Sequence, residues 1–248
     1  METHPRLYAK GVRKRQEILD KSLDVIAQRG FGETVLRDIA DAVNLSQAGV
    51  LHYFPSSEDL YLQIVDARER RRMETALRQV GDSGVIRIVD GAPAIGPEDP
   101  DSAIYTLISI FLRNIHHAQQ TPGLIELFVR MQALASSPSN PAYEYFRRRT
   151  DIIHASFEPF VAEVNRRGLL MRDWDPGKAI SIIVAMADGL ELQWVRDHGI
   201  DITGTLTLFF DLTLSGFEEW RRGEEIITPI PDDGTPSGND SAATTAKK

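Results

Sequence analysis

Two short helical segments near the N-terminus constrain the fold more than any other feature of this chain. Apolar residues recur at helical spacing over 35–43, and a second segment runs over 46–54 until a proline stops it. Asn44 tolerates the positive φ of a tight turn, and Ser46 can cap the second segment. Both segments can bury one face against the longer amphipathic helix before them. This arrangement predicts a helix-turn-helix unit over about 34–54.

Helical patterns dominate the rest of the chain. The first helix is expected to end near Gly30, and a fourth begins at Ser56, where Asp59 stands three residues later as in a capping box. Further helical segments are separated by Pro, Gly and Asn and lie near 102–119, 122–135, 141–167, 176–197 and 202–221. Only 85–89 resembles a short extended piece. We therefore predict an all-α fold.

The breaks between these segments suggest a division into domains. Residues 81–101 are rich in Gly, Pro and Asp, which is typical of a linker, and the polar end of the chain has the composition of a disordered tail. The predicted parts are a three-helix helix-turn-helix domain over 11–71, a helix end and linker over 72–101, a helical domain over 102–222 and a disordered tail over 223–248.

Composition excludes several kinds of site. The chain has no cysteine, which excludes disulfides, thiolate metal sites and a cysteine nucleophile. It has no Gly-rich phosphate loop, nucleophile elbow or HExxH motif, so we predict no catalytic residue, cofactor or metal site. The N-terminus lacks the apolar region of a secretory signal, and no apolar run reaches the ~18–20 residues of a membrane span. We expect a cytoplasmic protein without a membrane partner.

The charge distribution favours a nucleic-acid partner, although the net charge of −8 argues against one. Residues 1–80 hold 13 Lys and Arg against 12 Asp and Glu, whereas the remainder holds 15 against 24. Within the first 15 residues, Glu2 is the one acidic residue and the basic residues are Arg6, Lys10, Arg13, Lys14 and Arg15. The pattern predicts a basic arm on a near-neutral small domain, followed by an acidic large domain.

The start of the second short helix has residues that suit the major groove of DNA. Ser46, Gln47, Ala48 and Gly49 are small or able to form hydrogen bonds. Gly49 costs about 1 kcal/mol of helix propensity relative to Ala, which makes sense if a side chain there would block close approach. Gln47 can pair with adenine, or it can be a solvated residue at a helix start.

Two residues beyond that helix start are candidate phosphate contacts. His52 and Tyr53 can donate hydrogen bonds to phosphate oxygens, although the ring of Tyr53 can also pack against the protein. Val50 and Phe54 are more typical of a core.

Many spaced positions over 10–72 match the pattern of a known family. They are Ala27-Gln28-Arg29-Gly30-Phe31, Thr34, Leu36-Arg37-Asp38-Ile39-Ala40, Leu45-Ser46, His52-Tyr53-Phe54 and Ser56-x-Glu58-Asp59-Leu60. On these residues the segment resembles the N-terminal domain of the TetR family of transcriptional regulators. The resemblance implies a homodimer on a palindromic operator in double-stranded DNA, and a helical C-terminal domain for effector binding and dimerisation. Residues 188–194 resemble a stretch often found in that second domain.

The chain also departs from the family pattern. Arg37 is retained and, by the resemblance, contacts DNA. Many members have Lys where Ser57 stands and Tyr where Leu51 stands, and both would contact phosphate. Phosphate binding is therefore either weaker here or supplied by the basic arm.

The C-terminal half offers candidates for a ligand pocket. Phe128, Met131, Met186, Asp188 and Trp194 combine apolar bodies with a few polar groups, as in a small-molecule site, although core packing is the more common reason for such residues. The adjacent His116 and His117 point about 100° apart on a helix, so they do not chelate a metal together.

The segment 202–221 is apolar on more than one face, which requires partners on several sides. A second copy of the same helix is one such partner, and a two-fold dimer follows. Together with this dimer, the resemblance to the TetR family implies a ligand-responsive, DNA-binding transcriptional regulator, of the repressor type, that responds to an unknown small-molecule effector. A helical enzyme and a structural interaction protein are the alternatives.

Overall fold

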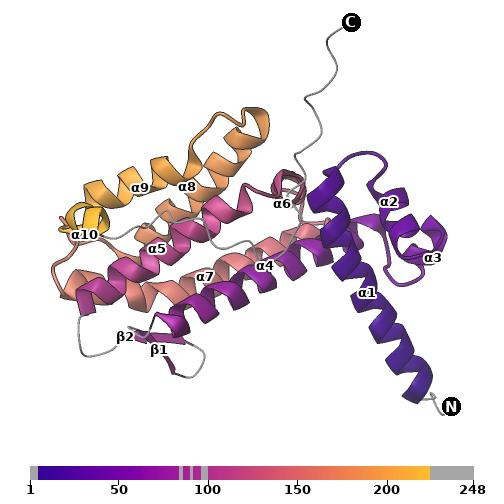
Figure 1. Cartoon of the computed structure of the whole chain (residues 1–248), viewed down its shortest axis with the longest axis horizontal. Coiled ribbons are helices and arrows are strands. Elements are labelled where there is room, and N and C mark those ends of the chain that lie inside the picture. Colours follow the sequence, from indigo (N-terminus) through magenta and orange to yellow (C-terminus); the bar gives the residue numbers. More distant parts are fainter. Residues whose placement is uncertain (1–4, 84–85, 90–91, 96–99, 224–248) are drawn as a thin grey trace, which may run out of the picture.

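The computed structural model describes residues 5–83, 86–89, 92–95 and 100–223, which form ten helices and one β-hairpin (Figure 1). The helices are α1 (Pro5–Arg29), α2 (Val35–Ala42), α3 (Gln47–Leu51), α4 (Ser57–Asp82), α5 (Pro100–Ala118), α6 (Pro122–Leu134), α7 (Pro141–Arg166), α8 (Pro176–Arg196), α9 (Ile202–Thr213) and α10 (Phe217–Gly223). Strands β1 (Ile86–Val89) and β2 (Ala92–Ile95) pair antiparallel. Apart from this hairpin, the described chain is all-α as predicted.

Helices α1, α2 and α3 lie together at one end of the molecule, and α1 extends beyond them toward the N-terminus (Figure 1). Ile18 and Ile26 of α1, Ile39 of α2 and Val50 of α3 are all fully buried. Burial of one face of each helix offsets the cost of forming helices as short as α2 and α3. Helix α1 begins at Pro5, six residues before residue 11, where the predicted helix-turn-helix domain begins.

One hydrophobic cluster joins this N-terminal unit to the C-terminal helices. It includes buried residues of α1–α4 together with Leu127, Phe128 and Met131 of α6 and Ala142 and Phe146 of α7. Helix α4 leaves the unit and runs along the rest of the molecule (Figure 1). The N-terminal unit and helices α6 and α7 therefore share one core rather than meeting across a polar boundary.

A second cluster fills the space between α5, α8, α9 and α10. Its most buried members include Ile104, Ile202, Leu206 and Phe217. The predicted helix over 202–221 is divided here, because Leu214 forms an isolated β-bridge with Leu170 and Gly216 takes a φ of 76°. A positive φ is readily available to glycine and incompatible with a continuing α-helix.

The predicted domain limits at 71, 101 and 222 stay predictions, and α4 continues without a break across the first of them. The extended piece predicted over 85–89 corresponds to β1, except for Val85, which lies outside the described residues. The predicted disordered tail also lies outside them, apart from Gly223. No helix within the described ranges is long and apolar enough to cross a membrane.

Candidate nucleic-acid interface

The turn between α2 and α3 is set by the two residues that the sequence suggests. Asn44 takes a φ of 54°, and the Leu45 N–H donates to the Ala40 carbonyl at 2.9 Å. Ser46 caps α3, since its Oγ accepts from the Gly49 N–H at 3.0 Å. These bonds satisfy backbone groups that a tight turn would otherwise leave unpaired, and they fix the direction in which α3 starts.

The start of α3 is open to solvent while its inner face is buried. Ser46, Gln47 and Ala48 are exposed, Gly49 is half-buried, and Val50 is fully buried. The small exposed side chains leave the amino end of α3 unobstructed, as entry into a major groove requires.

Gly49 also fits the cap itself. A Cβ at this position would lie 3.3 Å from Ser46 Oγ and 3.4 Å from Leu45 Cβ, which is tight but not impossible. Glycine at this position therefore avoids a tight contact within the protein, in addition to the predicted role of allowing close approach to DNA.

The aromatic residues after α3 divide as expected between inside and outside. His52 is exposed, Tyr53 is half-buried, and the two rings meet edge to face at 5.6 Å. Phe54 is 1% exposed and belongs to the core, with the Arg15 guanidinium 5.1 Å from its ring centroid.

Arg37 is exposed on α2, next to a small polar network. Asp38 accepts from Thr34 Oγ1 at 2.8 Å and pairs with Arg29 at 3.0 Å. The hydrogen bond from Thr34, followed by the Arg29 contacts, holds the pKa of Asp38 below its ordinary value. Thr34 stands at the N-cap of α2, but its side chain makes no capping bond because it donates to Asp38 instead.

The basic residues of α1 are partly engaged by the protein. Lys14 donates to the Val43 carbonyl at 3.1 Å and pairs with Glu17 at 2.8 Å, whereas Lys10 and Arg13 are exposed. The side chain of Arg6 lies outside the described part of the chain. Lys10, Arg13 and Arg15 are therefore the exposed basic side chains of the predicted arm within the described residues, and the Arg15 guanidinium also lies over the Phe54 ring.

Four of the five predicted pocket residues are divided between two different cores, and Asp188 belongs to neither. Phe128 and Met131 of α6 are buried in the cluster shared with α1–α4, whereas Trp194 of α8 is buried in the second cluster and Met186 packs against it. Asp188 accepts a hydrogen bond from Gln132 of α6 at 2.6 Å, and burial raises its pKa. All five residues lie on α6 or α8, and these two helices contact each other.

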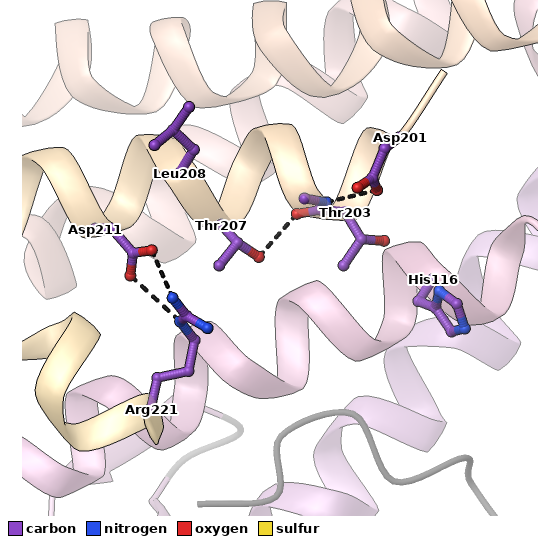
Figure 2. Close-up of a pocket in the computed structure, with 8 residues that line it drawn as sticks. His116, Asp201, Thr203, Thr207, Leu208, Asp211 and Arg221 are labelled. Atoms are coloured by element: carbon purple, nitrogen blue, oxygen red, sulfur yellow. Dashed lines mark hydrogen bonds and ion pairs between the residues drawn. The ribbon is translucent and has the colours of Figure 1, made fainter. Parts of the chain in front are cut away.

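A surface hollow of about 360 Å³ lies elsewhere, between α5, α9 and α10 (Figure 2). Arg221 pairs with Asp211 at 2.7 Å on one side, and Asp201 accepts from the Gly204 N–H at 2.7 Å on the other. None of the five predicted pocket residues lines it. His116 does line it, but the described residues contain no group of three metal-ligating side chains.

The sequence reasoning missed one buried charged residue. In the sequence, Arg68, Arg70, Arg71 and Arg72 are typical of a solvated helix face. In the structure Arg68 is only 5% exposed, and Glu191 of α8 is equally buried. Helical spacing could have predicted the burial of Arg68, because Arg68 lies one helical turn after Ile64, an apolar residue that is fully buried.

Comparison with known proteins places these features in context. A family model described as "Bacterial regulatory proteins, tetR family" matches residues 18–64. The transcriptional regulator RutR of Escherichia coli K12 is 40% identical over 52 residues, covering 21% of this chain and 24% of RutR. The transcriptional repressor AcnR of Corynebacterium efficiens is 29% identical over 103 residues, covering 42% of this chain and 50% of AcnR. The matched segments thus span a quarter to half of these relatives.

Solved structures resemble most of the described chain. A TetR transcription regulator from Haloarcula marismortui has a TM-score of 0.58 at 16% identity and covers 82% of this chain and 99% of its own. A putative transcriptional regulator from Saccharomonospora viridis, in complex with choline, has a TM-score of 0.56 at 21% identity and covers 82% and 98%. At these identities the likeness establishes the fold, including the helical C-terminal part.

Proposed function

We propose that this chain, a member of the TetR family of bacterial regulatory proteins, represses transcription by binding a palindromic operator as a dimer. The observation that carries the proposal is the open amino end of α3, where Ser46, Gln47 and Ala48 are exposed above a buried Val50. Arg37, Gly49, His52 and Tyr53 complete the proposed DNA surface. The match to a family of transcription regulators favours this function over the helical-enzyme alternative.

A dimer through α8 and α9 would bring two such surfaces onto one operator. Helix α9 exposes Leu208 and Leu212, at 56% and 65%, one turn apart, and α8 exposes Ile182 and Leu192. Large apolar side chains exposed on neighbouring helices are typical of an interface. The two copies of α3 must then lie one helical turn of DNA apart, ~34–36 Å.

The effector would be a small molecule bound between α6 and α8. The choline in the Saccharomonospora viridis structure supports a small ligand as a class. Phe128, Met131, Met186, Asp188 and Trp194 border this helix pair and are its proposed contacts. The ligand would release DNA by changing the separation of the two α3 helices.

Helix α6 is well placed to carry that change to the DNA surface. Gly123 lies at the second position of α6, and a Cβ there would come within 2.6 Å of the Gly30 Cα and of the Ile26 carbonyl oxygen. The Arg130 guanidinium lies 5.3 Å from the Phe31 ring centroid. Movement of α6 would therefore displace the end of α1 directly.

The test is binding of the full-length protein to labelled DNA that flanks its own gene. We expect a specific complex, and we expect Gln47→Ala to weaken it by ~1–3 kcal/mol while leaving the affinity for unrelated DNA unchanged. Gln28→Ala, at an exposed residue of α1, is the matched control. Equal losses on specific and unrelated DNA would exclude Gln47 as a base-reading residue, and absence of any specific complex would contradict the repressor.

A further inference from the structure

Arg68 of α4 is a cation buried inside the C-terminal part of the molecule. Its side chain is 5% exposed, and its Nη2 is buried without a hydrogen-bond partner among the described residues. A buried guanidinium nitrogen without an acceptor loses its hydration and gains nothing in return, which is unfavourable, and more so for a charged group than for a neutral one. Such an atom marks a place where an acceptor is missing.

Positive charge exceeds negative charge around this atom. Glu69 of α4 is the shared partner of three arginines: Arg72 at 3.2 Å, Arg68 at 3.5 Å and Arg149 of α7 at 4.0 Å. Within the described residues, no second carboxylate forms an ion pair with any of them. Burial favours the neutral form of Glu69, but the three arginines prevail and lower its pKa. One carboxylate thus serves three guanidinium groups.

The acidic residues of α8 do not supply the acceptor that Arg68 lacks. Glu191 is 5% exposed and, in the described structure, forms neither an ion pair nor a hydrogen bond. Asp188, one turn earlier, is held by Gln132. Burial raises the pKa of both carboxyls, and for Glu191 the nearby Arg68 opposes this without reversing it. A neutral Glu191 would be a hydrogen-bond donor near enough to Arg68 for the two charges to influence each other.

An aromatic ring holds two of the arginines in place. The guanidinium carbon of Arg149 lies 5.0 Å from the Phe128 ring centroid, and that of Arg68 lies 5.6 Å from it. Attraction between a cation and a ring face fixes each guanidinium while leaving its N–H edge available. Around the ring are apolar side chains of the first cluster, including Leu127 and Met131.

We propose that Arg68, with Arg149 and Glu191 beside it, is the recognition point for an effector that carries one carboxylate on an apolar body. One carboxylate oxygen accepts from Arg68 Nη2, and the apolar body lies along α6 near Met131. In its protonated form, Glu191 can donate to the other oxygen. A planar carboxylate suits a guanidinium edge. This inference rests on the proposed function, since it names the chemistry of the effector.

Ligand entry also has a mechanical consequence. Arg68 and Glu191 are both 5% exposed, so a ligand that reaches them must displace the side chains and helices that cover them. Such a site opens only as the ligand binds. Because α4 begins in the DNA-binding unit, the displacement is transmitted along that helix.

The test is calorimetric titration of the full-length protein, without DNA, using benzoate and hexanoate against the neutral benzamide and hexanamide. We expect each carboxylate to bind at least tenfold more tightly than its amide. Arg68→Gln should reduce carboxylate affinity at least tenfold. Arg70→Gln is the matched control, because Arg70 lies on the same helix, is 59% exposed and pairs with Asp66; it should bind like the wild type.

Glu191→Gln keeps a hydrogen-bond donor and cannot ionise, so it should bind benzoate at least as tightly as the wild type at pH 7. That variant and the amide comparison decide the matter even if Arg68→Gln does not fold. Absence of binding at 10 mM carboxylate, equal binding of the amides, or equal displacement of benzoate by inorganic phosphate would each overturn the inference. Carboxylate binding by a protein that recognises no operator would support the effector site and contradict the proposed repressor. Operator binding without carboxylate binding would support the proposed repressor and contradict the effector site.

Discussion

Replacement of Gly123 by alanine would test whether the contact between α6 and α1 matters. The new Cβ would lie 2.6 Å from both the Gly30 Cα and the Ile26 carbonyl oxygen and 2.9 Å from the Gly30 carbonyl carbon. All three are backbone atoms, so no side chain can rotate away. Ordinary contacts are about 3.5–4.0 Å, and the two backbones must therefore separate by roughly 1 Å.

The free energy of this separation can be bounded. Overpacking of a closed interior typically costs about 1–3 kcal/mol, and alanine returns up to ~1 kcal/mol of helix propensity. A net loss of about 1–2 kcal/mol should lower the melting temperature by roughly 2–8 °C for a chain of this size. The 1 Å shift also reorients the DNA-binding unit on α6, so we expect operator affinity to fall by about tenfold, or ~1.4 kcal/mol.

The chain provides a matched control for this substitution. Gly177 also follows the proline that begins a helix, α8, but a Cβ there would meet side-chain oxygens at 3.3 Å and beyond, which can move. Gly177→Ala should therefore leave both the melting temperature and operator affinity close to wild type. Scanning calorimetry and fluorescence anisotropy measure the two quantities. A Gly123→Ala protein that matches wild type in both would refute the proposed role of this contact.

Deletion of residues 1–10 should lower the slope of log affinity against log salt by about 1–2, because Arg6 and Lys10 are removed; an unchanged slope would show that the arm does not touch phosphate. Leu212→Glu should yield a monomer by light scattering at micromolar concentration, whereas the same change at the exposed Leu134 of α6 should not alter the mass. Glu191→Gln should stabilise the protein at pH 7 but not at pH 4 in urea titrations. The reason is that burial raises the pKa of Glu191, so the wild type loses stability as pH rises above the unfolded value near 4.5. A gain at pH 4 equal to that at pH 7 would contradict this assignment.

Local signals near the N-terminus predicted the helix-turn-helix unit correctly. The turn at Asn44 and the cap at Ser46 depend on residues within five positions of each other, so their chemistry could be read directly from the chain. Thr34 shows the limit of such reading. Its hydroxyl had two possible partners, a backbone N–H and Asp38, and only the folded geometry decides between them.

Long-range packing accounts for what the sequence did not predict. Arg68 stands in a run of arginines that reads as solvent-exposed, and its burial depends on Phe128, Arg149 and Glu191, which are 60 or more positions away. The division of the last long helix likewise depends on the bridge between Leu170 and Leu214, which joins two distant segments. The predicted contacts with DNA and effector stay predictions.

The hydrophobic cluster that joins α1–α4 to α6 and α7 limits how this protein can be re-engineered. Hybrid regulators are often imagined as one DNA-reading module joined to another sensor at a single crossover point. A crossover within α4 would here separate Ile26 and Val65 from Leu127 and Phe146, which share one core. A working chimera must therefore exchange the facing surfaces of α6 and α7 along with the reading module, as one transplantable block.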